Sequence, residues 1–314
     1  MKNKIMVVGC GNVGMAYVYA LLNQKNKVDE IALVDLDRER IEGEVMDLNH
    51  ALVLSEHSTS VKVGSYADAK DAKICCITAS RIAQAKTTSR MDELAKNKSL
   101  FQEIVGNVMN HGFQGIFLIA SNPVDIMAGI TQAIAKVDPS RVIGTGTALD
   151  TARLQYILSE NLKVDPQSID AYVLGEHGPN AFVLWSGAHL GTVSLNSLYD
   201  QEAKKTIERM VIQAGYDIVR RKKATYYGVA MTLVAITNAI LEDKKQMMIV
   251  SNYDEQNEVY IGSPVILGKT GIEKRLPFAL TDLEKTAYLK AVTAIHQGTK
   301  NDSIHVSTTY ETIE

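Results

Sequence analysis

The feature that most constrains the fold is a glycine-rich turn near the start of the chain, set between an apolar run and a helical pattern. The apolar residues 5–8 run into Gly-Cys-Gly-Asn-Val-Gly at positions 9–14. In a strand–turn–helix unit of this kind, the first glycine permits a tight turn, the second lets a pyrophosphate approach the backbone, and the third allows close packing of helix on strand. The N–H groups that open the helix point at the anion. The residues expected to form this cradle are Gly9, Gly11, Asn12, Val13 and Gly14.

A second apolar run, residues 31–34, ends at Asp35, about 20 residues after the glycine turn. A carboxylate at this place accepts hydrogen bonds from a ribose 2′-hydroxyl and repels a 2′-phosphate, so the pattern favours NAD over NADP. The alternative is a tight turn that binds nothing, and the spacing and the acid together argue against it.

Short apolar runs alternate with helical patterns through the first half of the chain. Strands are expected near 4–9, 30–35, 60–64, 73–78, 115–120 and 141–143. This alternation predicts an α/β fold with a doubly wound parallel sheet of the Rossmann type. We expect residues 1–144 to form this dinucleotide-binding domain.

Beyond about residue 145 the pattern changes to mixed helices and strands, which predicts an α+β catalytic domain over 145–314 in broad contact with the first. The segments expected there are a helix over 149–162, an extended stretch at 171–174, a long helical region at 200–242, strands at 247–250 and 259–267, and a last helix opened by the capping box Thr281-Asp282-Leu283-Glu284.

Composition excludes several classes of partner. The chain of 314 residues has a net charge of −3 and 22% charged residues, which indicates neither a nucleic-acid nor a membrane-surface protein. The basic cluster Arg220–Lys223 lies within a helical pattern and is interpreted as a solvated face. No apolar run approaches the ~18 residues of a membrane span, and no signal-peptide pattern opens the chain, so a cytoplasmic location is expected.

The three cysteines, Cys10, Cys75 and Cys76, lie in or beside expected buried strands. Neighbours on a strand point to opposite faces, so Cys75 and Cys76 are not expected to pair. We interpret all three as core thiols in a reducing compartment. No cysteine and histidine spacing resembles a zinc site, and no metal is expected.

Three segments carry residues suited to chemistry on a bound ligand. Asn122 follows the strand expected at 116–120, Asp150 and Arg153 share one helix face at i, i+3 spacing, and His177 stands between two glycines at the end of an expected strand. Each has an ordinary alternative: a turn residue before proline, a surface ion pair and a structural histidine.

Taken together, these residues fit hydride chemistry on a carbonyl. A histidine is a suitable proton carrier near neutral pH, and a neighbouring carboxylate would stabilise its charged form and fix its tautomer. An arginine fork matches a substrate carboxylate. The segment 80–90 lacks sustained periodicity and reads as a mobile lid, on which a second arginine would polarise the carbonyl while water is excluded.

The motifs GCGNVG, LVD, SNPVD, GTGT followed by LDTAR, and GEHG occur in the order and roughly the spacing of the NAD-dependent L-2-hydroxy acid dehydrogenases, the lactate/malate dehydrogenase family. Essentially the whole chain resembles this family. The resemblance implies that His177 donates and accepts the proton, that Asp150 orients it, and that Arg90 is the catalytic arginine of the lid. It also implies a homotetramer or dimer acting on a small 2-keto or 2-hydroxy acid, with NAD as cofactor.

The resemblance further implies which residues line the two ligand sites. The substrate would contact Gln84, Arg90, Asn122, Arg153 and the pocket-floor threonine, Thr225. Besides the glycine cradle, the cofactor would contact Asp35, Tyr66, Thr78, Ala79, Ala120 and Asn122.

Substrate choice is predicted from the lid. In the resembling family, glutamine six residues before the lid arginine fits lactate dehydrogenases and arginine fits malate dehydrogenases; here the residue is Gln84, which cannot pair with a second carboxylate. The surrounding lid departs from the family pattern, with one residue inserted beside Arg81, and a malate-like role for Arg81 stays open as a lesser alternative. We expect an L-lactate/pyruvate enzyme.

Two positions favour longer substrates. Gly215 stands where lactate dehydrogenases often have alanine, and residues 178–185 are similar to the L-2-hydroxyisocaproate branch. A dehydrogenase with broader tolerance for branched 2-keto acids is therefore the alternative, although neutral drift explains both positions equally well.

Activation by fructose 1,6-bisphosphate is not expected to be strong. The family's phosphate-binding arginine and histidine are replaced by Gln155 and Tyr172, which supply no positive charge. Two other classes of protein remain to be tested: a non-catalytic relative of the same fold, against which the intact His177, Asp150 and Arg153 argue, and an NAD-dependent glycosidase, whose metal site of cysteine and histidine finds no match here.

Overall fold

The computed structural model describes residues 2–55, 58–81 and 90–300. One mixed sheet, 11-stranded over these residues, runs through the molecule, and its first six strands are parallel in the order β3-β2-β1-β4-β5-β6. Their bounds are β1 (Lys4–Val8), β2 (Glu30–Val34), β3 (Ser60–Val63), β4 (Ile74–Ile77), β5 (Ile116–Ile119) and β6 (Val142–Gly144). The predicted doubly wound parallel sheet is confirmed, and each strand overlaps its predicted segment.

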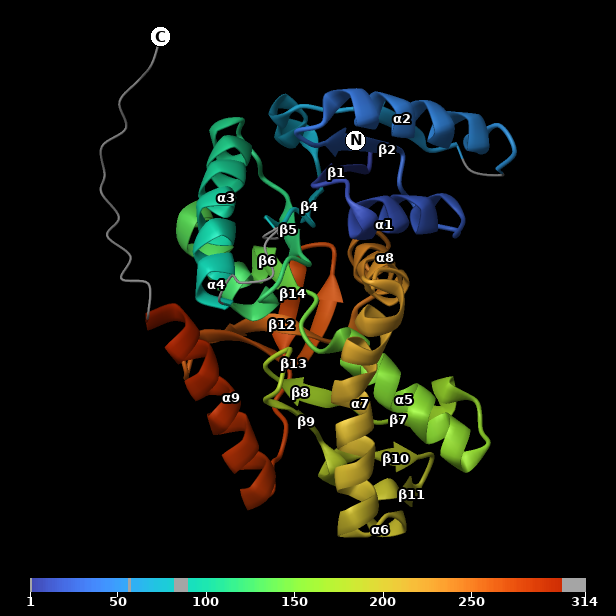
Figure 1. Ribbon diagram of the computed structural model, residues 1–314, viewed down its shortest axis with the longest axis vertical. Coiled ribbons are helices and arrows are strands. Elements are labelled where there is room, and N and C mark those ends of the chain that lie inside the picture. Colours follow the sequence, from blue (N-terminus) through green and yellow to red (C-terminus); the bar gives the residue numbers. More distant parts are fainter. Residues whose placement is uncertain (1, 56–57, 82–89, 301–314) are drawn as a thin grey trace.

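The central strands are apolar on both faces because helices cover both sides of the sheet. Every residue of β1, β4 and β5 is buried, including Cys75 and Cys76, and Cys10 is buried beside them. The helices of this half are α1 (Asn12–Leu22), α2 (Arg38–Leu52), α3 (Arg90–Asn110) and α4 (Val124–Ala135). One hydrophobic cluster joins the sheet to α1, α2 and α8 (Tyr227–Leu241), and another joins it to α3, α4 and α9 (Asp282–Lys300). Figure 1 shows α3, α4 and α9 on one side of the sheet and α1 and α8 on the other.

The second half of the chain extends the same sheet with antiparallel strands. From β6 the order continues β12-β13-β8-β9, with β14 beside β13, and β7, β10 and β11 form a small separate sheet. The strands are β7 (Ile169–Asp170), β8 (Val173–Gly175), β9 (Ala181–Val183), β10 (His189–Leu190), β11 (Val193–Ser194), β12 (Gln246–Asp254), β13 (Val259–Gly268) and β14 (Gly271–Arg275). The helices are α5 (Ala148–Leu162), α6 (Leu195–Leu198), α7 (Gln201–Lys222), α8 (Tyr227–Leu241) and α9 (Asp282–Lys300).

The long helical region expected at 200–242 is two helices. Lys223 has φ +73° and ends α7, and residues 224–226 separate it from α8. A lysine gives no composition signal for a left-handed helix end, which glycine usually supplies, so the break was not foreseen. The predicted capping box at the start of α9 is present, since the Glu284 carboxylate accepts the Thr281 N–H at 2.9 Å.

Small residues pair across the strands where the parallel part of the sheet meets the antiparallel part. Ser251 of β12 pairs with Gly144 of β6 on one side and with Gly262 of β13 on the other, and Gly262 pairs with Gly175 of β8. A side chain on Gly262 would overlap Thr147 at the start of α5. These close approaches bring the loop after β6 beside the end of β8, where His177 follows.

Within the described residues, no helix combines the length and the apolar character that crossing a bilayer requires.

Candidate active site

The glycine turn has the geometry expected of a phosphate cradle. Gly9 has φ +90°, and a side chain there would overlap the backbone of Ala79. A side chain on Gly14 would overlap the Gly9 carbonyl, whereas none of the described atoms lies within 4 Å of the place where a Cβ on Gly11 would stand. Gly11 is exposed and caps α1 without a side-chain hydrogen bond. The first and third glycines are thus required by packing, and the second leaves the helix N-terminus open to an anion.

The ends of three strands meet at this turn. The Thr78 hydroxyl, after β4, donates to the Gly9 carbonyl. The Ser121 hydroxyl, after β5, donates to the Ala79 carbonyl at 2.6 Å, and the Ala120 N–H donates to Ile77 at 3.0 Å. The expected cofactor residues Thr78, Ala79 and Ala120 are therefore brought to the edge of the sheet that carries the turn.

Asp35 is held in place by the backbone of this edge. Its Oδ2 accepts the Cys10 N–H at 2.7 Å and its Oδ1 accepts the Asp37 N–H at 3.1 Å. Arg40 lies beside it, with Nη2 3.2 Å from Asp35 Oδ2 and Nη1 donating to the Cys10 carbonyl at 2.8 Å. Sequence reasoning missed Arg40, although a basic residue in the first turn of the helix after Asp35 is a signal that could have pointed to it.

Tyr66 is placed differently from the other expected cofactor residues. It opens a short 3₁₀ helix, residues 66–71, and its half-buried ring stacks on His111, the residue that follows α3, with 6.5 Å between ring centroids. Burial raises the pKa of its hydroxyl. Its ring contact is thus with the residue at the end of α3.

The centre of the candidate site is a chain of three charged side chains. His177 Nδ1 lies 2.6 Å from Asp150 Oδ2, and Arg153 Nη1 donates to Asp150 Oδ1 at 2.7 Å. The i, i+3 spacing on α5 places Asp150 and Arg153 on one face, as expected. The Asp150 side chain is 8% exposed and the His177 side chain 26% exposed. Because Nδ1 is engaged by Asp150, Nε2 is the imidazole nitrogen left to face a ligand.

This arrangement favours a protonated histidine. Burial lowers the pKa of His177, but the hydrogen bond to Asp150 and the charge of Asp150, with a further contribution from Asp125, outweigh burial and raise it. Burial raises the pKa of Asp150, but the hydrogen bonds and charges of His177 and Arg153 outweigh burial and hold the pKa below its usual value. The pair can therefore hold a proton on His177 near neutral pH and release it to a bound oxygen.

Asn122 is exposed after the end of β5, where its amide can reach a ligand. Its carbonyl accepts a hydrogen bond from the Asn97 side chain of α3 at 3.2 Å. Three residues later, the buried Asp125 accepts the backbone N–H of His177 at 2.8 Å through Oδ2. Sequence reasoning missed Asp125, because an acidic residue in a helical first turn ordinarily indicates a cap and nothing more.

The junction of α7 and α8 forms another wall. A methyl group on Gly215 of α7 would lie 3.4 Å from Arg153 Nη2, so this position faces the guanidinium directly. Gly228, at the start of α8, packs against Leu149, the neighbour of Asp150. Thr225 lies in the connection between these helices, half-buried. The structure thus brings Gly215 to the Asp150–Arg153 pair and Thr225 to the adjoining connection.

The expected lid falls largely outside the described residues. Gln84 is among residues 82–89, and Arg90 is placed only as the first residue of α3. Arg81 is described: its guanidinium lies 3.6 Å from Glu103 of α3, and its N–H donates to Asn97 at 2.8 Å.

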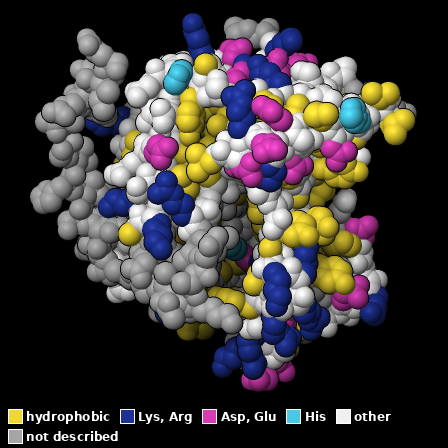
Figure 2. Space-filling view, turned by 45° about the horizontal axis from the view of Figure 1, so that its top comes forward, with side chains coloured by type: hydrophobic (Ala, Val, Ile, Leu, Met, Phe, Trp, Pro, Cys, Tyr) yellow, Lys and Arg dark blue, Asp and Glu magenta, His cyan; other side chains and the backbone are white. Residues whose placement is uncertain are grey.

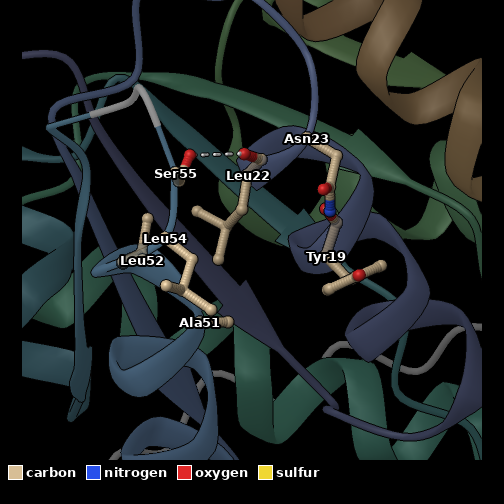
Figure 3. A pocket seen from close by; sticks show the side chains of 7 residues that line it. All are labelled: Tyr19, Leu22, Asn23, Ala51, Leu52, Leu54 and Ser55. Atoms are coloured by element: carbon tan, nitrogen blue, oxygen red, sulfur yellow. Dashed lines mark hydrogen bonds between the residues drawn. The ribbon is translucent and has the colours of Figure 1, made fainter.

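Two hollows lie away from His177. One, of about 430 Å³, lies between α1 and the end of α2 and is lined by Tyr19, Leu22 and Leu54 among others; Figure 3 shows it together with the Ser55–Leu22 hydrogen bond of 3.4 Å. The other, about 350 Å³, is bounded by β12, β14 and residues 138–140. No three-residue cluster of metal-binding side chains occurs within the described ranges.

Comparison with known proteins agrees with this geometry. The family model of the lactate/malate dehydrogenase NAD binding domain matches residues 3–144, and that of the α/β C-terminal domain matches residues 147–302. An L-lactate dehydrogenase of Halalkalibacterium halodurans is 42% identical over 294 residues, covering 92% of this chain and 94% of the relative. L-lactate dehydrogenase 2 of Bacillus cereus (strain ZK / E33L) is 39% identical over 305 residues, covering 94% and 96%.

Two solved structures are similar along nearly their whole length. A lactate dehydrogenase from a Medee basin deep-sea metagenome library has a TM-score of 0.92 at 38% identity, covering 96% of this chain and 98% of the other. The minor L-lactate dehydrogenase of Enterococcus mundtii, solved with bound ligands, has a TM-score of 0.92 at 32% identity, covering 97% and 99%.

Proposed function

The chain belongs to the lactate/malate dehydrogenase family, and we propose that it interconverts L-lactate and pyruvate with NAD and NADH. The observation that carries this proposal is the linked set His177, Asp150 and Arg153, which combines a proton carrier with a cation suited to a carboxylate. The curated relatives named L-lactate dehydrogenase support the choice of substrate. The family model of an NAD binding domain supports the cofactor.

The residues present fit a bound dinucleotide. The open backbone at Gly11 and the N-terminus of α1 would hold the pyrophosphate, and Asp35 would hold the adenine-side ribose. Thr78, Ala79 and Ala120 would line the site toward the nicotinamide, as would Asn122, whereas Tyr66 would have to reach the cofactor from the α3 side. When bound, NADH supplies the hydride that reduces the keto carbon.

The protein's own groups would act on the other atoms of the substrate. Protonated His177 would give its Nε2 proton to the carbonyl oxygen, and Asp150 would stabilise the charged imidazole before transfer. Arg153 would bind the carboxylate as a fork. Asn122 would orient the carbonyl oxygen and Thr225 would contact the substrate at the pocket floor. Arg90 would polarise the substrate carbonyl from the lid, and Gln84 would contact the substrate there, as the sequence predicts.

A second candidate, a dehydrogenase of longer or branched 2-keto acids, is favoured by Gly215. The missing side chain faces the cation that would hold the substrate carboxylate, so it enlarges the pocket where the substrate lies. A malate dehydrogenase is disfavoured, because Gln84 cannot pair with a second carboxylate.

Strong activation by fructose 1,6-bisphosphate is not proposed. The Gln155 amide donates to the Ile169 and Ala171 carbonyls at 3.2 and 3.4 Å, and the Tyr172 hydroxyl donates to the Asp170 carboxylate at 3.5 Å. The two side chains are thus engaged within the chain, and a carboxylate stands beside one of them, which opposes binding of a phosphate.

The division of the chain into domains 1–144 and 145–314, the assembly into a homotetramer or dimer and the cytoplasmic location are tested by limited proteolysis, light scattering and cell fractionation respectively. The support for an oligomer is that hydrophobic side chains are uncovered at the outer end of α2, as Figure 2 shows, and contact between subunits would bury them.

The test is NADH oxidation by the purified protein with pyruvate, 4-methyl-2-oxopentanoate and oxaloacetate, each with and without fructose 1,6-bisphosphate. We expect the highest kcat/KM with pyruvate and a half-saturating pyruvate concentration that the bisphosphate leaves within about twofold. His177→Asn should lower kcat by a factor of about 10² or more while NADH still binds.

Each other outcome has a definite meaning. Preference for oxaloacetate over both monocarboxylates would make the protein a malate dehydrogenase, and preference for the branched acid would select the second candidate. No turnover of any keto acid, with NADH bound normally, would mean a non-catalytic relative. Turnover of a glycoside that a chelator abolishes would replace the proposal with a glycosidase.

A further inference from the structure

Asp125 is a buried carboxylate that the reaction as described above does not use. It lies in the first turn of α4 and is 3% exposed. Its Oδ2 accepts the N–H of His177 at 2.8 Å, so the residue contacts the backbone of the histidine whose side chain Asp150 contacts. His177 is therefore held by two carboxylates, one at its ring and one at its main chain.

This hydrogen bond joins two loops that the sheet keeps apart. Asn122 and Asp125 follow β5, whereas His177 follows β8, and three strands, β6, β12 and β13, lie between β5 and β8 in the sheet. Asn122 is only three residues before Asp125. The hydrogen bond thus fixes the distance between the amide proposed to orient the substrate oxygen and the histidine proposed to protonate it.

The Asp125 carboxylate meets a second polar group, the Ser251 side chain of β12. Burial raises the pKa of Asp125 to about 6, while the hydrogen bonds with Ser251 and with the His177 N–H lower it, so the carboxylate is largely charged at pH 7 and above. A carboxylate is costly to bury away from water, which argues that this one serves more than packing.

The charges around His177 show what this carboxylate adds. Asp150 and Arg153 face the imidazole from α5, Asp125 faces it from α4, and Glu176 is its neighbour in the chain. Arg153 opposes protonation and is itself paired with Asp150. Asp125 is a second anion that favours protonation, and it contacts the main chain of His177 from α4.

We infer that Asp125 is a positioning residue, which locks the Asn122 loop to the His177 loop and biases His177 toward its protonated form. The inference rests on the proposed function, because it assumes that Asn122 and His177 act on one substrate oxygen. Holding the two loops together depends on a hydrogen-bond acceptor at position 125, and favouring protonated His177 depends on a negative charge there. The two parts can therefore be separated by substitution.

Asp125→Asn keeps an oxygen for the His177 N–H and removes the charge. The Ser251 side chain lies beside this group, and its hydroxyl can accept from the new amide N–H₂, so the variant should fold. Asp125→Ala removes both acceptor and charge. Asp254→Asn is the matched control, because it also removes a buried carboxylate, one that is bound by Arg275 and Tyr288 and does not contact the His177 loop.

The experiment measures kcat and KM for the wild-type protein's preferred keto acid across pH, NADH binding by fluorescence, and thermal unfolding. The His177 pKa is measured separately, by NMR titration of histidine-labelled protein, with the signal assigned by its loss in His177→Asn. This titration needs no turnover. It therefore tests the charge effect even if the substrate proposed above is wrong.

For Asp125→Ala we expect kcat to fall about tenfold or more while NADH affinity stays within about twofold. For Asp125→Asn we expect kcat near neutral pH to stay within a few-fold of wild type and the His177 pKa to fall by about half a unit or more. Reduction of the keto acid needs protonated His177. The fall of kcat with rising pH should therefore begin at a lower pH in Asp125→Asn than in the wild-type protein. Asp254→Asn should lower the unfolding temperature and leave both pH profile and kcat unchanged.

Two results would overturn the inference. If Asp125→Ala loses only thermal stability, as the control does, Asp125 is a structural residue. If Asp125→Ala does not fold, Asp125→Asn decides: an unchanged His177 pKa together with an unchanged pH profile would show that the charge does not act on His177.

Discussion

At the scale of the residue, Gly215 offers a direct test of substrate range. A methyl group added there would stand 3.4 Å from Arg153 Nη2, an ordinary van der Waals contact, so Gly215→Ala should fold without strain. It narrows the pocket beside the cation that would hold the substrate carboxylate. We expect kcat/KM for pyruvate to stay within about threefold and that for 4-methyl-2-oxopentanoate to fall about tenfold, a loss of the size that one methyl group typically causes in a pocket.

Gly43 of α2 provides the control for that substitution, since a Cβ there would enter open space among the described atoms. Gly43→Ala should leave the ratio of the two kcat/KM values unchanged. An equal loss on both substrates in Gly215→Ala would show that the position governs Arg153 itself and not substrate length.

Residue identities were recoverable from sequence where a motif carries the chemistry in its spacing. Asp150 and Arg153 share a helix face by the i, i+3 rule alone. Asp125 was not recoverable, because its partner is a backbone N–H 52 positions away that no pattern of side chains reports. Arg40 was missed for a similar reason, since its nearest acceptor is the carbonyl of Cys10.

At the scale of the element, a charge network joins the first three strands at the edge opposite the glycine turn. Lys4 of β1 contacts Asp68 at 2.9 Å and Asp71 at 2.7 Å, and Lys62 of β3 contacts Asp68 at 2.7 Å and Glu30 of β2 at 2.8 Å. Burial raises the pKa of Asp68, but hydrogen bonds from Lys62, the Ser65 N–H and Lys4 outweigh it and lower the pKa to about 2.

Asp68→Asn should therefore destabilise the protein by about 1–2 kcal/mol near neutral pH, measured by urea unfolding. Because the folded pKa lies below the unfolded one, the stabilisation is present above about pH 4 and is lost as pH falls toward 2, so the difference from wild type should shrink in acid. Asp71→Asn is the control: its side chain contacts the same Lys4 but is 70% exposed, and it should change stability much less. Equal losses in both variants would contradict this assignment.

Elements were predictable from sequence to the extent that local pattern decides them. The strands β1, β4 and β5 are continuous apolar runs between turn signals, and the structure has them where expected. The division between α7 and α8 was not predictable, because Lys223 adopts φ +73° without the glycine that usually marks such a helix end. The antiparallel extension of the sheet beyond β6 depends on long-range pairing, which periodicity does not encode.

At the scale of the whole molecule, the proposed oligomer predicts what covers the outer end of α2. Val53 and Leu54 are 82% and 91% exposed, and Leu54 shares the hollow of Figure 3 with Tyr19 of α1, itself 58% exposed. Adjoining apolar side chains that are this exposed to solvent indicate a surface for contact with another protein chain. Light scattering of the purified protein should therefore give a mass two or four times that of the 34.4 kDa chain.

Leu54→Lys should shift that mass toward the single chain, because a charge would be buried in each copy of the contact. Leu283→Lys is the control, since Leu283 is 79% exposed in the first turn of α9, away from α2, and should leave the mass unchanged. A wild-type mass of one chain at micromolar concentration would refute the oligomer. An unshifted mass in Leu54→Lys would keep the oligomer but move its interface away from α2.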